Sequence, residues 1–137
     1  MHEPEKDDEV ARSYPRFHDK GPIVDGTRLT LMSGRRSYRA DDDVRVHHVV
    51  EVVVPGRVLY AAGPKPVYGE FVDDVPATPA PPDDPFAAGP YNDMVLPTPA
   101  VDDNYDITTY RFAEPGRHRI EWRLGPLRSN VLLVDIV

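Results

Sequence analysis

Alternating apolar and polar positions dominate this chain and predict β-strands. The longest such run, Val44–Val54, consists mostly of β-branched residues, which favour a pleated, packed surface over a helix. Successive side chains of a strand point to opposite faces. One face of this strand carries valines at the even positions together with His48, and we expect it in a hydrophobic core. The other face carries Arg45, His47 and Glu51 beside two valines, which suits a sheet surface.

The same pattern predicts further strands, separated by turn signals rich in Gly, Pro and Asp. Within His118–Leu124, apolar residues that include Trp122 alternate with charged residues, so this is the clearest one-sided strand. No segment shows the periodicity of an amphipathic helix. The sequence therefore predicts an all-β fold, an antiparallel β-sandwich of about seven strands. The further strands are expected at Arg28–Met32, Arg57–Ala61, Val67–Val72, Tyr105–Phe112, His118–Leu124 and Asn130–Val137.

Two segments lack the strand pattern. Residues 1–26 are charged and interrupted by Pro and Gly, so we expect an acidic, partly disordered N-terminal arm that Tyr14 and Phe17 attach to the body. Residues 73–104 contain half of the 16 prolines, and proline fixes φ and supplies no ladder donor. We expect a long Pro-rich loop there, with a short edge strand at Met94–Leu96. Residues 27–137 are thus interpreted as a single domain that carries this loop.

The last predicted hairpin resembles that of immunoglobulin-like and fibronectin-III-like bacterial modules. Pro115-Gly116 and the alternating residues up to Trp122 carry the resemblance, together with Ser129-Asn130 before the last apolar strand. The turn at Tyr38 before Val44 resembles the early strands of such modules. The resemblance implies an immunoglobulin-like scaffold with a Pro-rich insertion. It implies no catalytic residue, because these families are defined by their scaffold.

Composition argues against several classes of protein. The net charge of −7 disfavours a nucleic-acid or anionic-membrane partner. The chain has no Cys, which excludes disulfides and thiolate chemistry. No apolar run approaches the roughly 20 residues that span a bilayer, and no secretory signal is visible. We therefore expect a cytoplasmic protein.

Two segments resemble parts of a cupin metal motif, namely His47-His48 with Glu51 and Pro115-Gly116-Arg117-His118. Adjacent histidines of a strand point to opposite faces, and His47 and Glu51 would lie about 13 Å apart at the usual strand rise. We interpret His48 as a hydrogen-bonded core residue and His47 as a sheet-surface residue. His47 and His118 remain the histidine candidates for a metal site.

Acidic clusters in predicted loops offer the oxygen ligands that Ca²⁺ prefers. The candidates are Asp73, Asp102 and Asp103. None of the acidic clusters matches the twelve-residue calcium loop, and Asp is a common turn residue. We expect no cofactor, and Ca²⁺ remains the alternative.

The sequence contains no nucleophile elbow, phosphate loop or dinucleotide fingerprint, so we expect no enzyme. We expect instead a module that binds another protein, or a second copy of itself through edge strands. The Pro-rich loop would carry the contact, because prolines lower the ordering cost of binding, with Phe86, Tyr91 and Met94 as apolar anchors. Two alternatives stay open: an intracellular protease inhibitor on an immunoglobulin-like scaffold, and a cupin-like barrel that holds a small ligand or metal.

Overall fold

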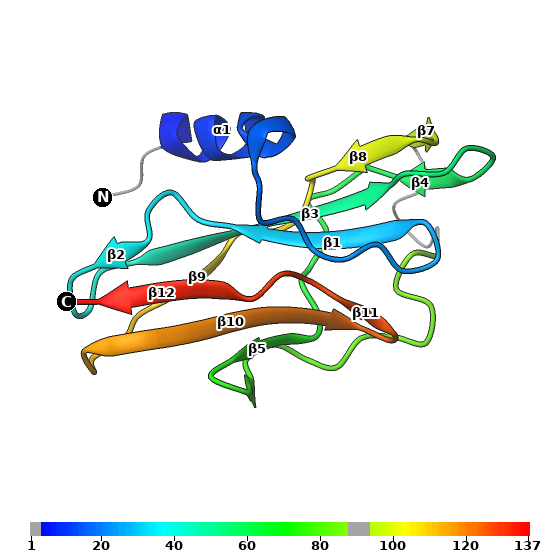
Figure 1. Ribbon diagram of the computed structural model, residues 1–137. Helices are drawn as coiled ribbons and strands as arrows, with labels where there is room; N and C mark the ends of the chain where they lie inside the picture. The colour runs from blue at the N-terminus through cyan, green and yellow to red at the C-terminus, as the bar shows by residue number, and fades with distance from the viewer. Residues whose placement is uncertain (1–3, 88–93) are drawn as a thin grey trace.

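The computed structural model describes residues 4–87 and 94–137 and is predominantly β (Figure 1). A helix, α1 (Pro4–Arg12), and a 3₁₀ turn, η1 (Tyr14–Arg16), precede twelve strands in these ranges. The all-β prediction is confirmed, and the strands outnumber the predicted set because several short strands were not foreseen. None of the helices in the described ranges could cross a membrane. The strands are β1 (Thr27–Met32), β2 (Ser37–Tyr38), β3 (Val44–Val52), β4 (Val58–Tyr60), β5 (Glu70–Val72), β6 (Val75–Pro76), β7 (Val95–Pro97), β8 (Ala100–Asp102), β9 (Thr108–Tyr110), β10 (Gly116–Leu124), β11 (Leu127–Arg128) and β12 (Leu132–Ile136).

The strands form two principal sheets and a ribbon. The first sheet has the order β1-β3-β8, with β9 also paired to β3. The second has the order β2-β12-β10-β5-β6, with β11 also paired to β10, and β4 and β7 form the ribbon. All pairings between these strands are antiparallel except that of β2 with β12, which is parallel. The prediction of a purely antiparallel fold is therefore wrong at this edge, where the β1–β3 connection runs beside the last strand (Figure 1).

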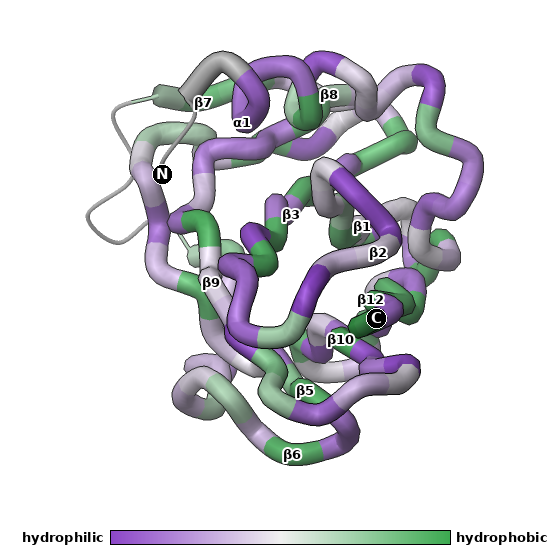
Figure 2. Tube along the Cα trace, turned by 90° about the vertical axis from the view of Figure 1, so that its left-hand side faces the viewer, coloured by the Kyte–Doolittle hydropathy of each residue, from purple (hydrophilic) through white to green (hydrophobic). Residues whose placement is uncertain are grey.

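The two principal sheets stack with their apolar faces together, an arrangement compatible with a β-sandwich (Figure 1). Hydrophobic and hydrophilic residues are interspersed along β3 (Figure 2). Val44, Val46 and Val50 are fully buried in the same core as Ile120 and Trp122 of β10. Each such side chain contributes about 1.5–3 kcal/mol by leaving water, so this interior holds the two layers together.

The opposite face of β3 is covered by the N-terminal segment. Arg45 donates two hydrogen bonds to Asp7 of α1, at 3.1 and 2.8 Å, and the Tyr14 hydroxyl donates to Glu51 at 2.6 Å. Tyr14 also packs with Val49 in a second, smaller core, as its predicted anchoring role requires. The prediction that this face of β3 lies at the surface is wrong. Val10 is the main apolar contact of α1 with the body. A single such residue gives no apolar periodicity from which a helix could be predicted.

The Pro-rich insertion is integrated into the fold. Its strand β8 pairs with the central strand β3, and β7 forms near the predicted edge strand at Met94–Leu96. Residues 77–79 are fastened to β5: the Gly69 N–H donates to the Pro79 carbonyl at 2.8 Å, and the Glu70 N–H donates to Thr78 Oγ1 at 2.9 Å. The described part of this segment is therefore held by hydrogen bonds to both principal sheets and to β4 rather than being a free loop.

Candidate functional site

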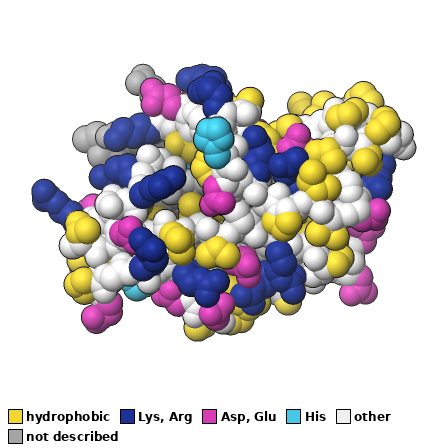
Figure 3. All heavy atoms as spheres, in the orientation of Figure 1, with side chains coloured by type: hydrophobic (Ala, Val, Ile, Leu, Met, Phe, Trp, Pro, Cys, Tyr) yellow, Lys and Arg dark blue, Asp and Glu magenta, His cyan; other side chains and the backbone are white. Residues whose placement is uncertain are grey.

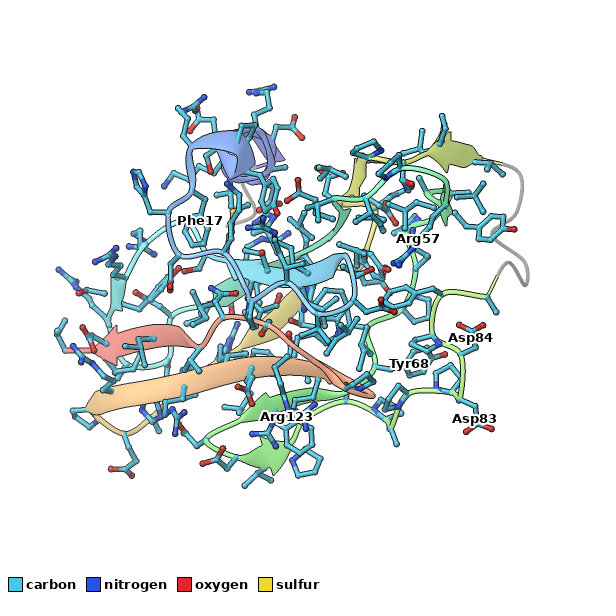
Figure 4. All side chains as sticks on the ribbon, turned by 45° about the vertical axis from the view of Figure 1, so that its right-hand side comes forward. Phe17, Arg57, Tyr68, Asp83, Asp84 and Arg123 are labelled. Atoms are coloured by element: carbon cyan, nitrogen blue, oxygen red, sulfur yellow. The ribbon has the colours of Figure 1, made fainter. Side chains whose placement is uncertain are left out.

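A pocket of about 380 Å³ opens between the Pro-rich segment and the strands beside it. This volume lies within the usual range of ligand sites. Prolines of the insertion form part of its wall, and Tyr68 and Asp84 lie at the same end of the molecule, with Asp83 pointing outward (Figure 4). Most of the lining is apolar or aromatic. The aromatic residues are Tyr60, Tyr68, Phe86, Tyr105 and Trp122.

Trp122 is the most firmly held part of this wall. Its side chain is 1% exposed, and its indole N–H donates to the Tyr68 carbonyl at 2.8 Å. The Tyr105 ring meets it edge-on, with the ring centres 5.2 Å apart. Edge-to-face pairs of this kind are favourable beyond their buried area. The wall is consequently preformed, so a ligand would not have to order it.

Among the described residues, one lysine lines the pocket, and the charge of its side chain is neutralised. Lys65 Nζ lies 2.7 Å from Asp102 Oδ2, donates to the Ala62 carbonyl at 3.1 Å and stands 4.5 Å above the Tyr105 ring. Asp102 is 2% exposed, so its burial is compensated by this pair. Burial raises the pKa of Tyr105, and the Asp102 carboxylate adds to that effect. The Tyr105 hydroxyl therefore remains a hydrogen-bond donor at any physiological pH.

A sealed polar network lies on the other side of Trp122. His48 packs edge-on against the Trp122 ring at 5.0 Å, and its Nε2 forms a hydrogen bond with Glu70 Oε2. The hydroxyls of Thr108 and Tyr110 both donate to Glu70 Oε1 at 2.5 Å. The network ties β3 and β9 of the first sheet to β5 of the second. Because neither Glu70 nor His48 side chain reaches solvent, the pair serves the scaffold rather than a substrate.

The charge of Glu70 is maintained by its partners. Desolvation alone would raise the pKa of Glu70, but the hydrogen bond and charge of His48, followed by the two hydroxyls, lower it below its usual value. Burial raises the pKa of Tyr110, and the Glu70 charge and hydrogen bond act in the same direction. The carboxylate thus stays ionised and the phenol protonated. His48 is the hydrogen-bonded core histidine that the sequence predicts.

Of the residues predicted as metal ligands, Asp73 and His118 meet, whereas the others lie apart from them. His47 points toward α1, with Nε2 3.3 Å from Asp7 Oδ1, and lies on the face of β3 opposite His48. Asp102 is paired with Lys65, while Asp103 is exposed. In residues 4–87 and 94–137, no group of three or more His, Cys, Asp or Glu is arranged to hold a metal ion.

Asp73, a predicted Ca²⁺ ligand, forms a tight turn with Asp74. Both residues have positive φ, 49° and 65°, and join β5 to β6 in a two-residue hairpin with Val72 opposite Val75. Such φ values define a type I′ turn, which Asp tolerates better than most residues. Asp73 Oδ1 also accepts the backbone N–H of Arg119 at 2.9 Å. The turn and this bond account for the acidic pair without a cation.

His118, a predicted metal candidate, instead joins this turn to the start of β10. Its Nδ1 lies 2.7 Å from Asp73 Oδ2, its Nε2 lies 2.9 Å from the Glu114 carbonyl, and its ring stacks on Phe112 at 4.2 Å. Both neighbouring oxygens are acceptors, so both ring nitrogens must donate and the imidazole is held in its charged form. The hydrogen bond to Asp73, then that to Glu114, raises the pKa of His118.

Replacement by glutamine, His118→Gln, is expected to destabilise the protein by about 0.5–1 kcal/mol near pH 5.5, the usual range for a largely exposed pair. A raised folded-state pKa means that the stabilisation is fully present below the unfolded value and is lost as pH rises through the folded value. Urea unfolding of both proteins at pH 5.5 and pH 9 measures the difference. A deficit that stays constant between these pH values would contradict the charged state assigned to His118.

Two of the predicted partner anchors are described, and they occupy different places. Phe86 lines the pocket and packs against the core, whereas Met94 is 51% exposed outside the pocket lining. Tyr91 lies outside the described residues. Met94 belongs to an exposed apolar patch, which we define as Val58, Met94, Val95 and Val101 and which gathers over β4, β7 and β8 (Figure 3). Hydrophobic patches on a protein surface often mark interaction sites.

The roles of Glu70 and of the Lys65–Asp102 pair were not predicted, because in each case the two partners lie far apart along the chain. A charged residue at an inward position of a predicted strand is the one available signal, and Glu70 fits it. No protein-family model, curated protein or solved structure matches this chain. The resemblance to immunoglobulin-like modules therefore stays a prediction.

Proposed function

We propose that this protein is a non-enzymatic binding module that captures a segment of another protein in its aromatic pocket. The preformed pocket beside the Pro-rich segment carries this proposal. Aromatic residues combine a large apolar area with a polar edge, and they are enriched at protein interfaces. The scaffold is proposed to be an elaborated immunoglobulin-like sandwich, on which the insertion adds the recognition surface.

The chemistry of the pocket favours binding over catalysis. Lys65 is engaged by Asp102, and the Glu70–His48 pair is closed off behind Trp122. Within the described residues, no pair of free ionisable groups faces the pocket at the short distance that proton transfer requires. Its apolar wall is suited to burying a side chain of a partner.

The apolar patch would add to the surface that the pocket offers a partner. Tyr60 lines the pocket and shares one face of β4 with Val58 of the patch, since the two are alternate residues of one strand. A specific interface usually buries about 800 Å² on each partner, more than one pocket provides. Asp83 and Asp84 at the rim, with the net charge of −7, favour a partner segment that carries Lys or Arg beside its apolar anchor.

Blocking the pocket tests this function. We expect peptides selected from a phage-displayed random library to bind the wild type and to lose at least tenfold in affinity against Ala87→Phe, which places a ring at the pocket wall. Val75→Phe is the matched control, because Val75 is 63% exposed on β6 and outside the pocket lining. Trp122 is the only Trp, so its fluorescence reports binding directly. Selected peptides that bind Ala87→Phe as well as the wild type would reject the pocket as the site.

A further inference from the structure

We infer that the segment captured in the pocket is an extended, proline-bearing one, bound with proline rings against the aromatic wall. This inference rests on the proposed function and specifies its partner. Polyproline segments are preformed and dock in grooves lined with aromatic rings.

The chain already packs its own prolines on this wall. Pro82 and Pro85 line the pocket together with Tyr68 and Trp122. A third proline of the lining, Pro66, comes from outside the insertion. Proline rings therefore already share this wall with aromatic rings, and a proline of a ligand would meet the same kind of surface.

The wall also provides hydrogen-bond donors that have no acceptor within the described part of the chain. An extended polyproline chain makes no internal hydrogen bonds, so its carbonyls seek donors from a partner. The hydroxyls of Tyr60, Tyr68 and Tyr105 have no hydrogen-bond partner among the residues that the structure describes. Trp122 is already committed, because its N–H donates to the Tyr68 carbonyl. The tyrosine hydroxyls are thus the donors available to a ligand carbonyl.

Two outer strands are poorly suited to the other common way of binding an extended peptide, which is to add a strand to a sheet edge. Pro76 lies on β6 at the end of the second sheet, and Pro97 lies on β7 of the ribbon. A proline on an edge strand removes a donor and protects that edge from pairing. At these two edges, recognition of an extended segment through side-chain packing is favoured over backbone pairing.

Two synthetic peptides test the inference, one of repeated Ala-Pro-Pro triplets and one of repeated Ala-Leu-Ser triplets of equal length. We expect the proline peptide to perturb Trp122 fluorescence and its indole N–H resonance, with affinity reduced at least tenfold by Ala87→Phe. Tyr105→Phe should weaken binding about fivefold, the effect of one neutral hydrogen bond. Tyr38→Phe is the matched control, because Tyr38 is buried beside β12, outside the pocket lining. Melting temperatures establish that each variant is folded.

The outcomes distinguish a failure of this inference from a failure of the proposed function. Binding of the leucine peptide alone, sensitive to Ala87→Phe, would overturn the preference for proline and leave the proposed function standing. Binding of the proline peptide that neither Ala87→Phe nor Tyr105→Phe weakens would place the site elsewhere and overturn the inference. If neither peptide binds while library peptides depend on the pocket, the inference fails alone. If library selection fails as well, the proposed function fails with it.

Discussion

Replacing His48 by leucine is expected to destabilise the protein by about 3–5 kcal/mol, because the buried Glu70 carboxylate loses the hydrogen-bond partner of its Oε2. The hydroxyls of Thr108 and Tyr110 would remain on Oε1, but Oε2 would face an apolar side chain. An unpaired buried charge is among the few causes of so large an effect. Urea unfolding at pH 7, followed by circular dichroism, measures the loss.

The double variant His48→Leu/Glu70→Leu is the control that distinguishes the loss of the hydrogen-bonded pair from a change in core packing. Removing both partners of a buried polar pair is often neutral or even stabilising when the replacement packs well, so it should recover much of the loss. The pH dependence provides a second check. Without His48, desolvation would raise the pKa of Glu70, so the deficit should shrink as pH falls and the carboxyl is protonated. A deficit below about 1 kcal/mol, or one that grows in acid, would contradict the role of His48 as the partner of a buried carboxylate.

Strand positions and their inward faces were predictable because they depend on local periodicity. In β3, the alternation of Val44, Val46 and Val50 with polar residues is enough to place one face in the core, and β10 follows the same rule around Trp122. Every alternate side chain must point the same way whatever the partner strand is. The predicted burial of His48 follows from its place in that series. A histidine buried among valines requires a hydrogen-bond partner.

What covers the outer face of β3 could not be predicted in the same way. Arg45 and Glu51 look like surface residues until Asp7 and Tyr14 are placed beside them, and these lie far away in sequence. A short helix with one apolar contact residue, Val10, carries no clear periodic signal. The helix is specified by tertiary contacts rather than by its own pattern.

The candidate site was predictable only in outline. The Pro-rich insertion indicated where a recognition surface would lie, and Phe86 does line the pocket. The rest of the wall comes from Tyr60, Tyr105 and Trp122, on segments that converge only in the folded chain. The Ca²⁺ expectation at Asp73 stays a prediction, because a type I′ turn and a Ca²⁺ loop use the same residue type.

Trp122→Ala is expected to cost about 3–5 kcal/mol, since it empties a large buried volume between the two sheets. The rings of His48 and Tyr105 would both lose their contact with the Trp122 ring. The sealed network and the pocket wall should therefore both become less rigid. Leu133→Ala on β12 is the control: that side chain is 42% exposed and should change stability by at most about 1 kcal/mol.

Trp122→Phe separates the two roles of the indole. The smaller ring keeps most of the apolar contact but cannot donate to the Tyr68 carbonyl, so it should cost less than the alanine variant and still weaken peptide capture. Urea unfolding gives the stability, and a fluorescently labelled library peptide gives the affinity, because these variants lack the intrinsic reporter. Equal losses of stability for Trp122→Ala and Leu133→Ala would be incompatible with a dry interior between stacked sheets. Unchanged peptide affinity in Trp122→Phe would show that the wall tolerates a free Tyr68 carbonyl, and recognition would then depend on the tyrosine hydroxyls alone.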